Sequence, residues 1–313
     1  MFADEFVVYK TVAETNNITL AAKRLHISQP AISLQIQNIE NYYGVKFFVR
    51  SNKGVSMTPA GKMFYKFVCN MLDMMDNVRR EIRSLSGEPQ GEVCLGVSLT
   101  IGDYLLPDIL AYMAREQPHT SLHVKVANTE TVMREVLERG IRIGLVEGPI
   151  TNPHGLIVES FWQDELVAAV SCDHPWARQG SVSLGELIQA DLVLREEGSG
   201  TRKGFEQFLQ QRGVRLADCK VVMELGSLGA IKKVVANSKG VTVLSDLAVS
   251  REQADKVLVI LKVEDMTMKR EFSVVTNADS SALTEEELFV LGLVRDRERL
   301  SVLLHGLYDQ IEP

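Results

Sequence analysis

Small hydroxyl side chains recur where predicted strands give way to predicted helices. Two of them end the apolar run that begins at Val93, two follow Leu192–Leu194, and one precedes a helical pattern from Leu228. Hydroxyls beside the free N–H groups of a helix start favour a bound anion. Each turn alone is better explained as a helix cap, but the repetition makes one shared ligand cleft an equal alternative. The hydroxyl residues are Ser98, Thr100, Ser199, Thr201 and Ser227.

A second set of polar side chains lies on one face of a helix predicted from Ser28 to about Tyr43. Ser28 is a favourable N-cap, and Pro30 stands in the first turn, where a missing N–H costs little. A buried stripe is predicted at Ile32, Ile36, Ile39 and Tyr43. The opposite face carries Gln29, Ser33 and Gln37, with Glu40 beyond. Such side chains can read base edges in a major groove, and an ordinary solvated helix face is the alternative.

The segments on either side of this helix favour the DNA-binding alternative. Residues 2–16 carry one apolar helical stripe, and Thr19 is expected to cap a short helix over residues 20–25. Residues 45–49 and 55–57 predict two strands joined through Asn52-Lys53-Gly54. That hairpin would form a wing with Arg50 and Lys53 as its basic side chains.

Charge is distributed unevenly along the chain. The net charge of −7 over 313 residues disfavours nucleic acid as a partner at first sight. Residues 1–66, however, hold eight Lys and Arg against four Asp and Glu, which gives them +4 and leaves −11 on the remainder. A basic N-terminal segment on an otherwise acidic chain fits phosphate contact by that segment alone.

A long helix is predicted from Pro59 to about Leu85. At 1.5 Å per residue such a helix would be roughly 40 Å long. Its apolar side chains follow a spacing of three and four and need a partner surface. These side chains are Phe64, Phe67, Met71, Met74 and Val78. Gly87 to Gly91 is then expected to act as a hinge.

Beyond residue 91 predicted strands alternate with predicted helices, which is typical of an α/β fold with two lobes. The expected strands cover 93–99, 121–127, 141–146, 166–170, 192–194, 221–225, 241–244 and 272–275. The expected helices cover 104–116, 131–139, 184–189, 203–212, 228–237 and 285–304.

Several functional classes lack their signals. No run of about 18 apolar residues and no signal peptide is evident, so a cytoplasmic protein without a membrane partner is expected. The four cysteines and six histidines form no ligand cluster, so neither a metal nor a cofactor is expected. Gly198 to Gly204 lacks the order of a phosphate loop, and no nucleophile elbow or zinc-protease motif occurs. An enzyme is therefore disfavoured.

Residues 21–61 resemble the LysR-type transcriptional regulators over some 40 positions. The matching residues are Ala21, Ala22, Leu25, Ser28 to Ser33, Ile36, Glu40, Gly44, Phe48, Arg50 and Thr58 to Gly61. Phe47 and Met57 replace the leucines usual there. Leu34 stands where a basic or polar residue is frequent, so no DNA contact is expected from that position.

The resemblance implies an all-α winged helix-turn-helix followed by a two-lobed α/β effector domain similar to periplasmic solute-binding proteins. The expected boundaries are 1–60 for the DNA-binding domain, with the helix-turn-helix at about 18–37, 59–86 for a dimerisation helix and 91–304 for the effector domain. Lobe I would comprise 91–163 and 266–304, and lobe II 164–265. The DNA contacts would come from Ser28, Gln29, Pro30, Ser33, Gln37, Arg50 and Lys53.

The same resemblance implies partners. These are double-stranded promoter DNA, RNA polymerase, further copies in a dimer or tetramer, and a small effector between the lobes. Effector contacts are expected from Ser98, Thr100, Glu147, Ser199, Thr201 and Ser227. An anionic effector is favoured because donors outnumber acceptors.

Two rival functions fit the sequence less well. A free-standing solute-binding module would leave residues 1–85 unexplained. A peroxide sensor of the same family would need two cysteines near the second-lobe loop, where only Cys219 is close in sequence.

Overall fold

The fold is that of a computed structural model, which describes residues 2–51, 54–85, 92–117, 120–151, 153–263, 267–279 and 283–304. The chain divides into two compact units, Met1–Gly91 with Asp279–Thr284, and Glu92–Ala278 with Glu285–Pro313. Lys53 and the predicted hinge at 87–91 lie outside the described residues, as does the side chain of Arg50. No described helix is long and apolar enough to cross a membrane.

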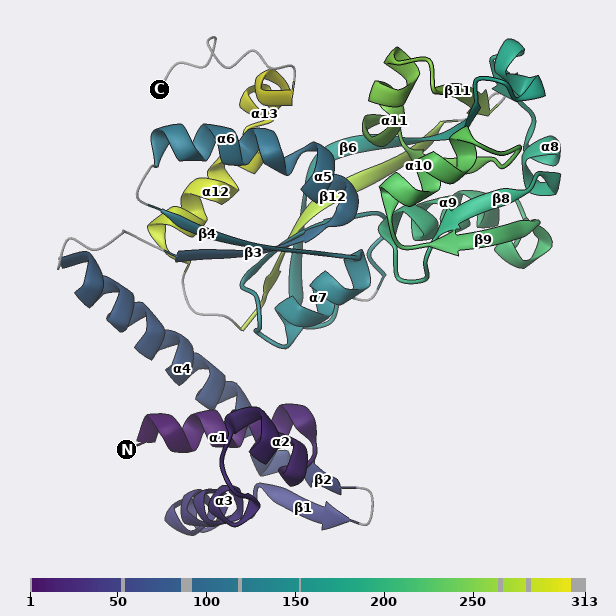
Figure 1. Cartoon of the computed structure of the whole chain (residues 1–313). Helices are drawn as coiled ribbons and strands as arrows, with labels where there is room; N and C mark the ends of the chain where they lie inside the picture. Colours follow the sequence, from purple (N-terminus) through teal and green to yellow (C-terminus); the bar gives the residue numbers. More distant parts are fainter. Residues whose placement is uncertain are drawn as a thin grey trace. The chain divides into compact units, whose positions relative to one another are not determined.

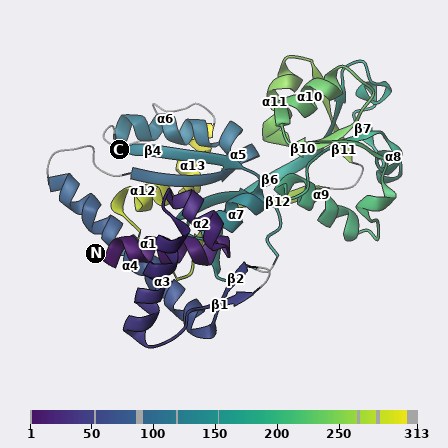
Figure 2. The same ribbon diagram turned by 60° about the horizontal axis from the view of Figure 1, so that its bottom comes forward.

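The first unit is helical with one small hairpin (Figures 1 and 2). Its elements are α1 (Phe2–Thr15), α2 (Ile18–Leu25), α3 (Gln29–Tyr43), β1 (Phe48–Ser51), β2 (Gly54–Met57) and α4 (Pro59–Leu85). The hairpin pairs Phe48 with Met57 in an antiparallel register. Its first strand begins three residues later than predicted, because Val45 N donates to Glu40 O and still belongs to the turn that ends α3.

The turn before α2 differs from the prediction. Asn17, and not Thr19, is the N-cap, and its side chain accepts a hydrogen bond from Leu20 N at 3.1 Å. Thr19 instead accepts a hydrogen bond from the Gln29 side chain of α3. Both residue types favour caps, so the local sequence alone did not distinguish them.

An aromatic core fixes α3 and the hairpin against α1 and α4. Tyr9 is fully buried, and its hydroxyl donates to Gly61 O at 2.9 Å. The Phe47 and Phe64 rings are stacked at 4.4 Å between centroids. A Cβ on Gly61 would lie 2.2 Å from Phe47 O, so only glycine allows α4 to approach the hairpin this closely.

The prediction that Glu40 lies beyond the polar face of α3 is wrong. Its side chain is 7% exposed and accepts hydrogen bonds from Phe47 N at 2.9 Å and Phe48 N at 3.2 Å. Lys46 Nζ lies 2.6 Å from the other carboxylate oxygen. The carboxylate turns inward because the start of β1 offers N–H donors that would otherwise be unpaired.

The second unit contains two lobes connected by long strands. Its largest sheet has the order β4-β3-β5-β12-β6-β11-β7, and β10 also pairs with β6. The first part of β6 (Leu156–Ser171) pairs with β12 (Met268–Asn277), and its last part pairs with β10 and β11. These two strands therefore pass through both lobes, as Figure 1 shows.

Lobe I is built on the parallel strands β3, β4 and β5, with β12 antiparallel beside them. α6 and α12 lie on one face of these strands and α7 on the other (Figure 1). The elements are β3 (Glu92–Ser98), α5 (Leu99–Tyr104), α6 (Leu106–Glu116), β4 (Ser121–Ala127), α7 (Thr129–Leu137), β5 (Ile143–Glu147), α12 (Glu285–Arg295) and α13 (Arg297–Leu304).

Lobe II surrounds the end of β6. Its apolar core joins Leu166 and Val170 of that strand to Phe205 and Leu209 of α9. The elements are η1 (Pro175–Arg178), β7 (Ser181–Val182), α8 (Leu184–Gln189), β8 (Leu192–Arg195), α9 (Gly200–Gln210), η2 (Leu216–Asp218), β9 (Val221–Leu225), α10 (Leu228–Ala236), β10 (Thr242–Ser245), α11 (Asp246–Ala254) and β11 (Leu258–Val263).

Three element predictions need correction. The helix expected over 104–116 is two helices, because the backbone is interrupted at Leu105. The strand expected over 166–170 begins ten residues earlier, since the first part of β6 is paired along β12 and its charged side chains masked the pattern. The closing helix is divided at Asp296, whose carboxylate accepts from Arg299 N at the start of α13.

Candidate functional site

Glu147 lies where the two lobes meet. It is the last residue of β5, and its carboxylate is 1% exposed. One carboxylate oxygen, Oε2, accepts from Ser98 Oγ at 2.8 Å, and the other, Oε1, accepts from Thr100 Oγ1 at 2.9 Å. Thr201 Oγ1 donates to the same Oε1 at 3.3 Å. Ser98 and Thr100 belong to lobe I and Thr201 to α9 of lobe II, so one carboxylate joins both lobes.

A buried ion pair lies beside this carboxylate. Arg270 of β12 and Asp164 of β6 are register partners, and Arg270 Nε lies 2.6 Å from Asp164 Oδ2. The guanidinium also donates to Thr201 Oγ1 at 2.9 Å and Thr100 Oγ1 at 3.3 Å, and lies 3.5 Å from Glu147 Oε1. Burial raises the pKa of Asp164, and the Arg270 charge limits that rise.

The backbones around Glu147 approach each other too closely for side chains. A Cβ on Gly200 would lie 1.9 Å from Glu147 O, and one on Gly148 would lie 2.4 Å from Gly200 O. Gly148 also has a φ of +90°. Glu147 O accepts a hydrogen bond from Thr129 Oγ1 at 3.0 Å. Glycine at these two positions lets the start of α9 sit directly on the end of β5.

A second group of charges surrounds the contact between α5 and lobe II. Lys232 of α10 donates to the Tyr104 hydroxyl at 2.8 Å and lies 2.6 Å from Glu252. Arg195, at the end of β8, is 1% exposed and forms a two-point pair with Glu196 at 2.8 and 2.9 Å. Burial raises the pKa of Asp103, and the charges of Arg195 and Lys232 oppose that rise.

The six predicted effector residues do not all meet. Ser98, Thr100, Glu147 and Thr201 form the cluster described above. Ser199 is buried and caps α9 by accepting from Arg202 N, and Ser227 is an exposed cap of α10 that accepts from Ala230 N. For these two serines the geometry is that of a helix cap, whereas the other hydroxyls point to a carboxylate.

Arg270 and Asp164 belong to the cluster but were not identified from the sequence. Each is a charged residue inside a strand, in Lys269-Arg270-Glu271 and Gln163-Asp164-Glu165. Both stand where the chain was expected to cross between lobes. A signal in the sequence that could have identified Arg270 and Asp164 is a pair of opposite charges at the two points where the chain crosses between the lobes.

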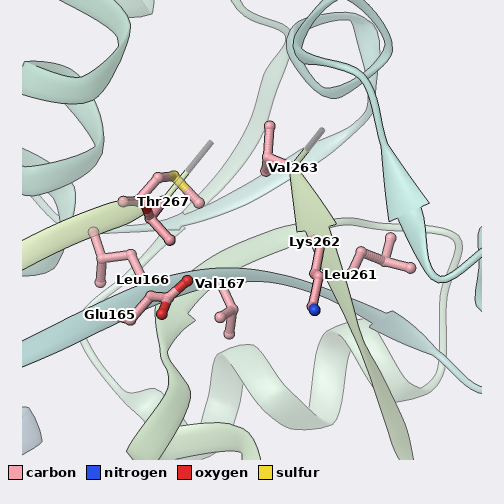
Figure 3. A pocket seen from close by; sticks show the side chains of 8 residues that line it. Glu165, Leu166, Val167, Leu261, Lys262, Val263 and Thr267 are labelled. Atoms are coloured by element: carbon pink, nitrogen blue, oxygen red, sulfur yellow. The ribbon is translucent and has the colours of Figure 1, made fainter. Parts of the chain in front are cut away.

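A separate pocket of about 240 Å³ lies in lobe II (Figure 3). Its walls come from β6, β11 and β12, and its lining is mostly aliphatic with one carboxylate and one ammonium group. The lining residues are Glu165, Leu166, Val167, Leu261, Lys262, Val263, Thr267 and Met268. None of the six predicted effector residues is among them.

The start of α3 presents its polar side chains to solvent. Ser28, Gln29, Pro30 and Gln37 are exposed, and Ser33 is half-buried. Ser28 is also the N-cap of α3, accepting from Ala31 N at 3.3 Å. The predicted inner stripe is present at Ile32, Ile36 and Ile39, but Tyr43 is 49% exposed. A helix start that presents exposed polar side chains suits entry into a DNA groove.

The long helix α4 has an inner and an outer apolar face. Phe64 and Val68 are buried in the core of the first unit. The outer face is apolar and exposed, with Met63, Phe67, Met71, Met74, Met75 and Val78 each at least 37% accessible. Phe64 was predicted on the same seam as Phe67, but the two lie on different sides of the helix.

Comparison with known proteins decides the family. Residues 4–62 match the family described as "Bacterial regulatory helix-turn-helix protein, lysR family", and residues 86–291 match "LysR substrate binding domain". This chain is a LysR-type transcriptional regulator. It is 32% identical over 290 residues to the regulator CysL of Bacillus subtilis, covering 93% of this chain and 96% of CysL.

Solved structures share the fold of this LysR-type chain. Full-length OxyR from Pseudomonas aeruginosa is similar with a TM-score of 0.62 and 22% identity, over 100% of this chain and 99% of that one. The regulatory domain of CcmR from Synechocystis PCC6803, in complex with 2-PG, has a TM-score of 0.59 and 27% identity, over 66% of this chain and 96% of that one. The family matches confirm the predicted family and its role as a transcriptional regulator rather than an enzyme, and together with these structures they confirm the predicted fold class.

Cys219 of this LysR-type regulator gives no support to a peroxide sensor. Cys219 is partly buried, and burial beside Asp218 raises the pKa of its thiol. A raised pKa leaves less of the reactive thiolate at neutral pH.

Proposed function

We propose that this LysR-type regulator reads promoter DNA with the start of α3 and is controlled by a small anionic effector bound between the lobes. The observation that carries the effector proposal is the convergence of Ser98 and Thr100 from lobe I, and Thr201 from lobe II, on one carboxylate. Groups that hold the Glu147 carboxylate are suited to hold the carboxylate or other oxyanion of a ligand. The CcmR regulatory domain in complex with 2-PG supports a small-molecule ligand for this domain.

Thr100→Val tests the effector site, because it keeps the shape and removes one hydroxyl. Loss of a hydrogen bond to an anion should cost about 1–3 kcal/mol of ligand affinity. The measurement is calorimetric titration of the full chain with small carboxylates, phosphate and sulfate, beside a DNA-binding assay. An anion bound equally well by the variant would contradict the assignment of Thr100, and loss of DNA binding without any ligand would make the residue structural.

For DNA, we propose that Ser28, Gln29 and Ser33 face the major groove, with Pro30 and Gln37 beside them, and that Arg50 and Lys53 of the wing contact phosphate. Gln29→Ala should relax specificity at one base position by roughly 1–3 kcal/mol. Arg50→Ala should weaken binding about equally for all sequences, because a phosphate contact carries no base information. Footprints on the region upstream of its own gene would measure both. The opposite pattern would reverse the two roles.

For assembly, we propose that the outer face of α4 pairs with the same face of a second copy, and that dimers join into a tetramer. The exposed run from Met63 to Val78 supports this, because so much contiguous apolar surface is unfavourable in water. A two-fold pair would place two DNA-reading helices on neighbouring half-sites. RNA polymerase is a further proposed partner at the promoter.

A further inference from the structure

We propose that Glu147 is a built-in ligand of the effector cleft, and that an anionic effector binds by displacing the Glu147 carboxylate. The effector class is a small carboxylate or similar oxyanion that takes over the same donors. This inference rests on the proposed function and adds a mode of regulation to it: the effector must compete with a side chain of the regulator itself.

The Glu147 carboxylate is bound as a ligand would be. Three hydroxyls donate to its two oxygens, those of Ser98, Thr100 and Thr201 at 2.8, 2.9 and 3.3 Å, and the Arg270 guanidinium forms an ion pair with it at 3.5 Å. A carboxylate offers about four acceptor positions, so little capacity remains on either side. The three hydroxyl protons are therefore in use, and a second anion cannot accept them while Glu147 stays.

The charge balance makes Glu147 the replaceable member of the cluster. Arg270 already has Asp164 as its register partner, at 2.6 Å. Glu147 adds a second buried carboxylate to a single guanidinium, so the three side chains carry a net charge of −1. Buried excess charge is costly, and hydroxyl donors offset that cost only partly. Withdrawal of Glu147 should therefore cost less than breaking the Arg270–Asp164 pair.

Arg195 is an independent sign that this cleft accepts anions. Its side chain is 1% exposed, and its Nη1 has no hydrogen-bond partner among the residues that the structure describes. Asp103 of α5 interacts electrostatically with both Arg195 and Glu147, so these two groups belong to the same region. An unpartnered buried guanidinium N–H is unfavourable unless a ligand or water satisfies it.

Chemical rescue tests the inference directly. Glu147→Ala removes a carboxylate and leaves its donors, so acetate should occupy the vacated position in the full-length protein. The melting temperature should fall in the variant and rise with acetate by on the order of 3–5 °C for each tenfold increase above the dissociation constant. Wild type should show no such rise over the same acetate concentrations, because acetate must there compete with Glu147. Sodium chloride of equal ionic strength serves as the salt control.

Glu159→Ala is the matched control variant. Glu159 is a carboxylate of β6 that pairs with Arg295 at 2.6 Å but is 46% exposed. Its removal should lower stability slightly without creating any response to acetate. Adding Thr100→Val to Glu147→Ala should weaken the acetate response about tenfold in concentration, because one donor to the anion is lost.

Other outcomes separate this inference from the proposed function. Equal acetate responses in wild type, Glu147→Ala and Glu159→Ala would overturn it. If Glu147→Ala does not fold without acetate, refolding in acetate or chloride replaces the melting experiment, and equal yields would overturn it. Wild type could respond to an effector, with Thr100→Val weakening that response, while Glu147→Ala takes up no acetate. That result would refute the built-in ligand and leave the proposed function standing. Acetate uptake by Glu147→Ala, with no anion affecting DNA binding by wild type, would support the built-in ligand and refute the effector role.

Discussion

Arg270 is the single cation between two buried carboxylates in the described cluster, so its removal should have a large and pH-dependent effect. Arg270→Met keeps most of the apolar volume but leaves Asp164 and Glu147 without a positive partner. Removing one partner of a buried ion pair costs about 3–5 kcal/mol. The upper part of that range is expected, because two carboxylates of 2% and 1% side-chain exposure lose the same guanidinium.

The pH dependence has a definite sign. Burial already raises the pKa of Asp164 in the folded protein, and Arg270 restrains it. Without Arg270 that pKa should rise further, so the folded variant binds protons more readily than the unfolded chain. The contribution of the Asp164 carboxyl to the free energy of unfolding is then greatest at acidic pH, and it is lost as pH rises through the folded pKa of Asp164. The difference between wild type and variant should therefore be smaller near pH 5 than near pH 7.5.

Urea unfolding followed by tryptophan fluorescence measures this effect. Both tryptophans of the chain, Trp162 in β6 and Trp176 in η1, belong to the second unit and report its unfolding. Combining Arg270→Met with Asp164→Asn and Glu147→Gln provides a neutral cluster as the control, and it should recover part of the loss. A difference below about 1 kcal/mol, the size of an exposed pair, would refute the reasoning.

Two further perturbations test the contact between lobes and the proposed pairing of α4. Gly200→Ala would put a Cβ 1.9 Å from Glu147 O and should destabilise the second unit by about 1–3 kcal/mol. Gly185→Ala, with open space around its Cβ, is the control and should leave the stability unchanged. Urea unfolding midpoints compare the two variants, and equal midpoints would contradict the close approach at Gly200. Met71→Lys should dissociate the dimer, because a buried unpaired charge costs several kcal/mol. Val7→Lys on α1 is the control and should leave the dimer intact. If sedimentation shows an unchanged, folded oligomer for Met71→Lys, the outer face of α4 is not the dimer interface.

Much of the first unit was predictable because its elements are determined by nearby residues. Ser28 caps α3, Gly44 ends it with a φ of +68°, and the isoleucines of α3 lie inside as their spacing predicts. The errors occurred where a distant group decided the outcome. Glu40 was expected to point outward, but it binds N–H groups of Phe47 and Phe48 that come seven and eight residues later.

The candidate effector site shows the same division more sharply. Hydroxyls at strand-to-helix turns were visible in the sequence, and Thr100 and Thr201 do converge, whereas Ser227 remains an exposed cap. Nothing in the local pattern distinguished these outcomes, because a cap and a ligand contact use the same residue types.

The sequence alone determined the family, most of the helices and strands and the polar face of α3, because each depends on periodicity and spacing over a few dozen residues. Only the tertiary structure decided which side chains meet around Glu147. Thr100 and Arg270 meet across 170 positions of the chain, and Glu147 receives its donors from both lobes. Such contacts arise where β6 and β12 cross between lobes, and the free energy of pairing buried charges, rather than any local propensity, selects them.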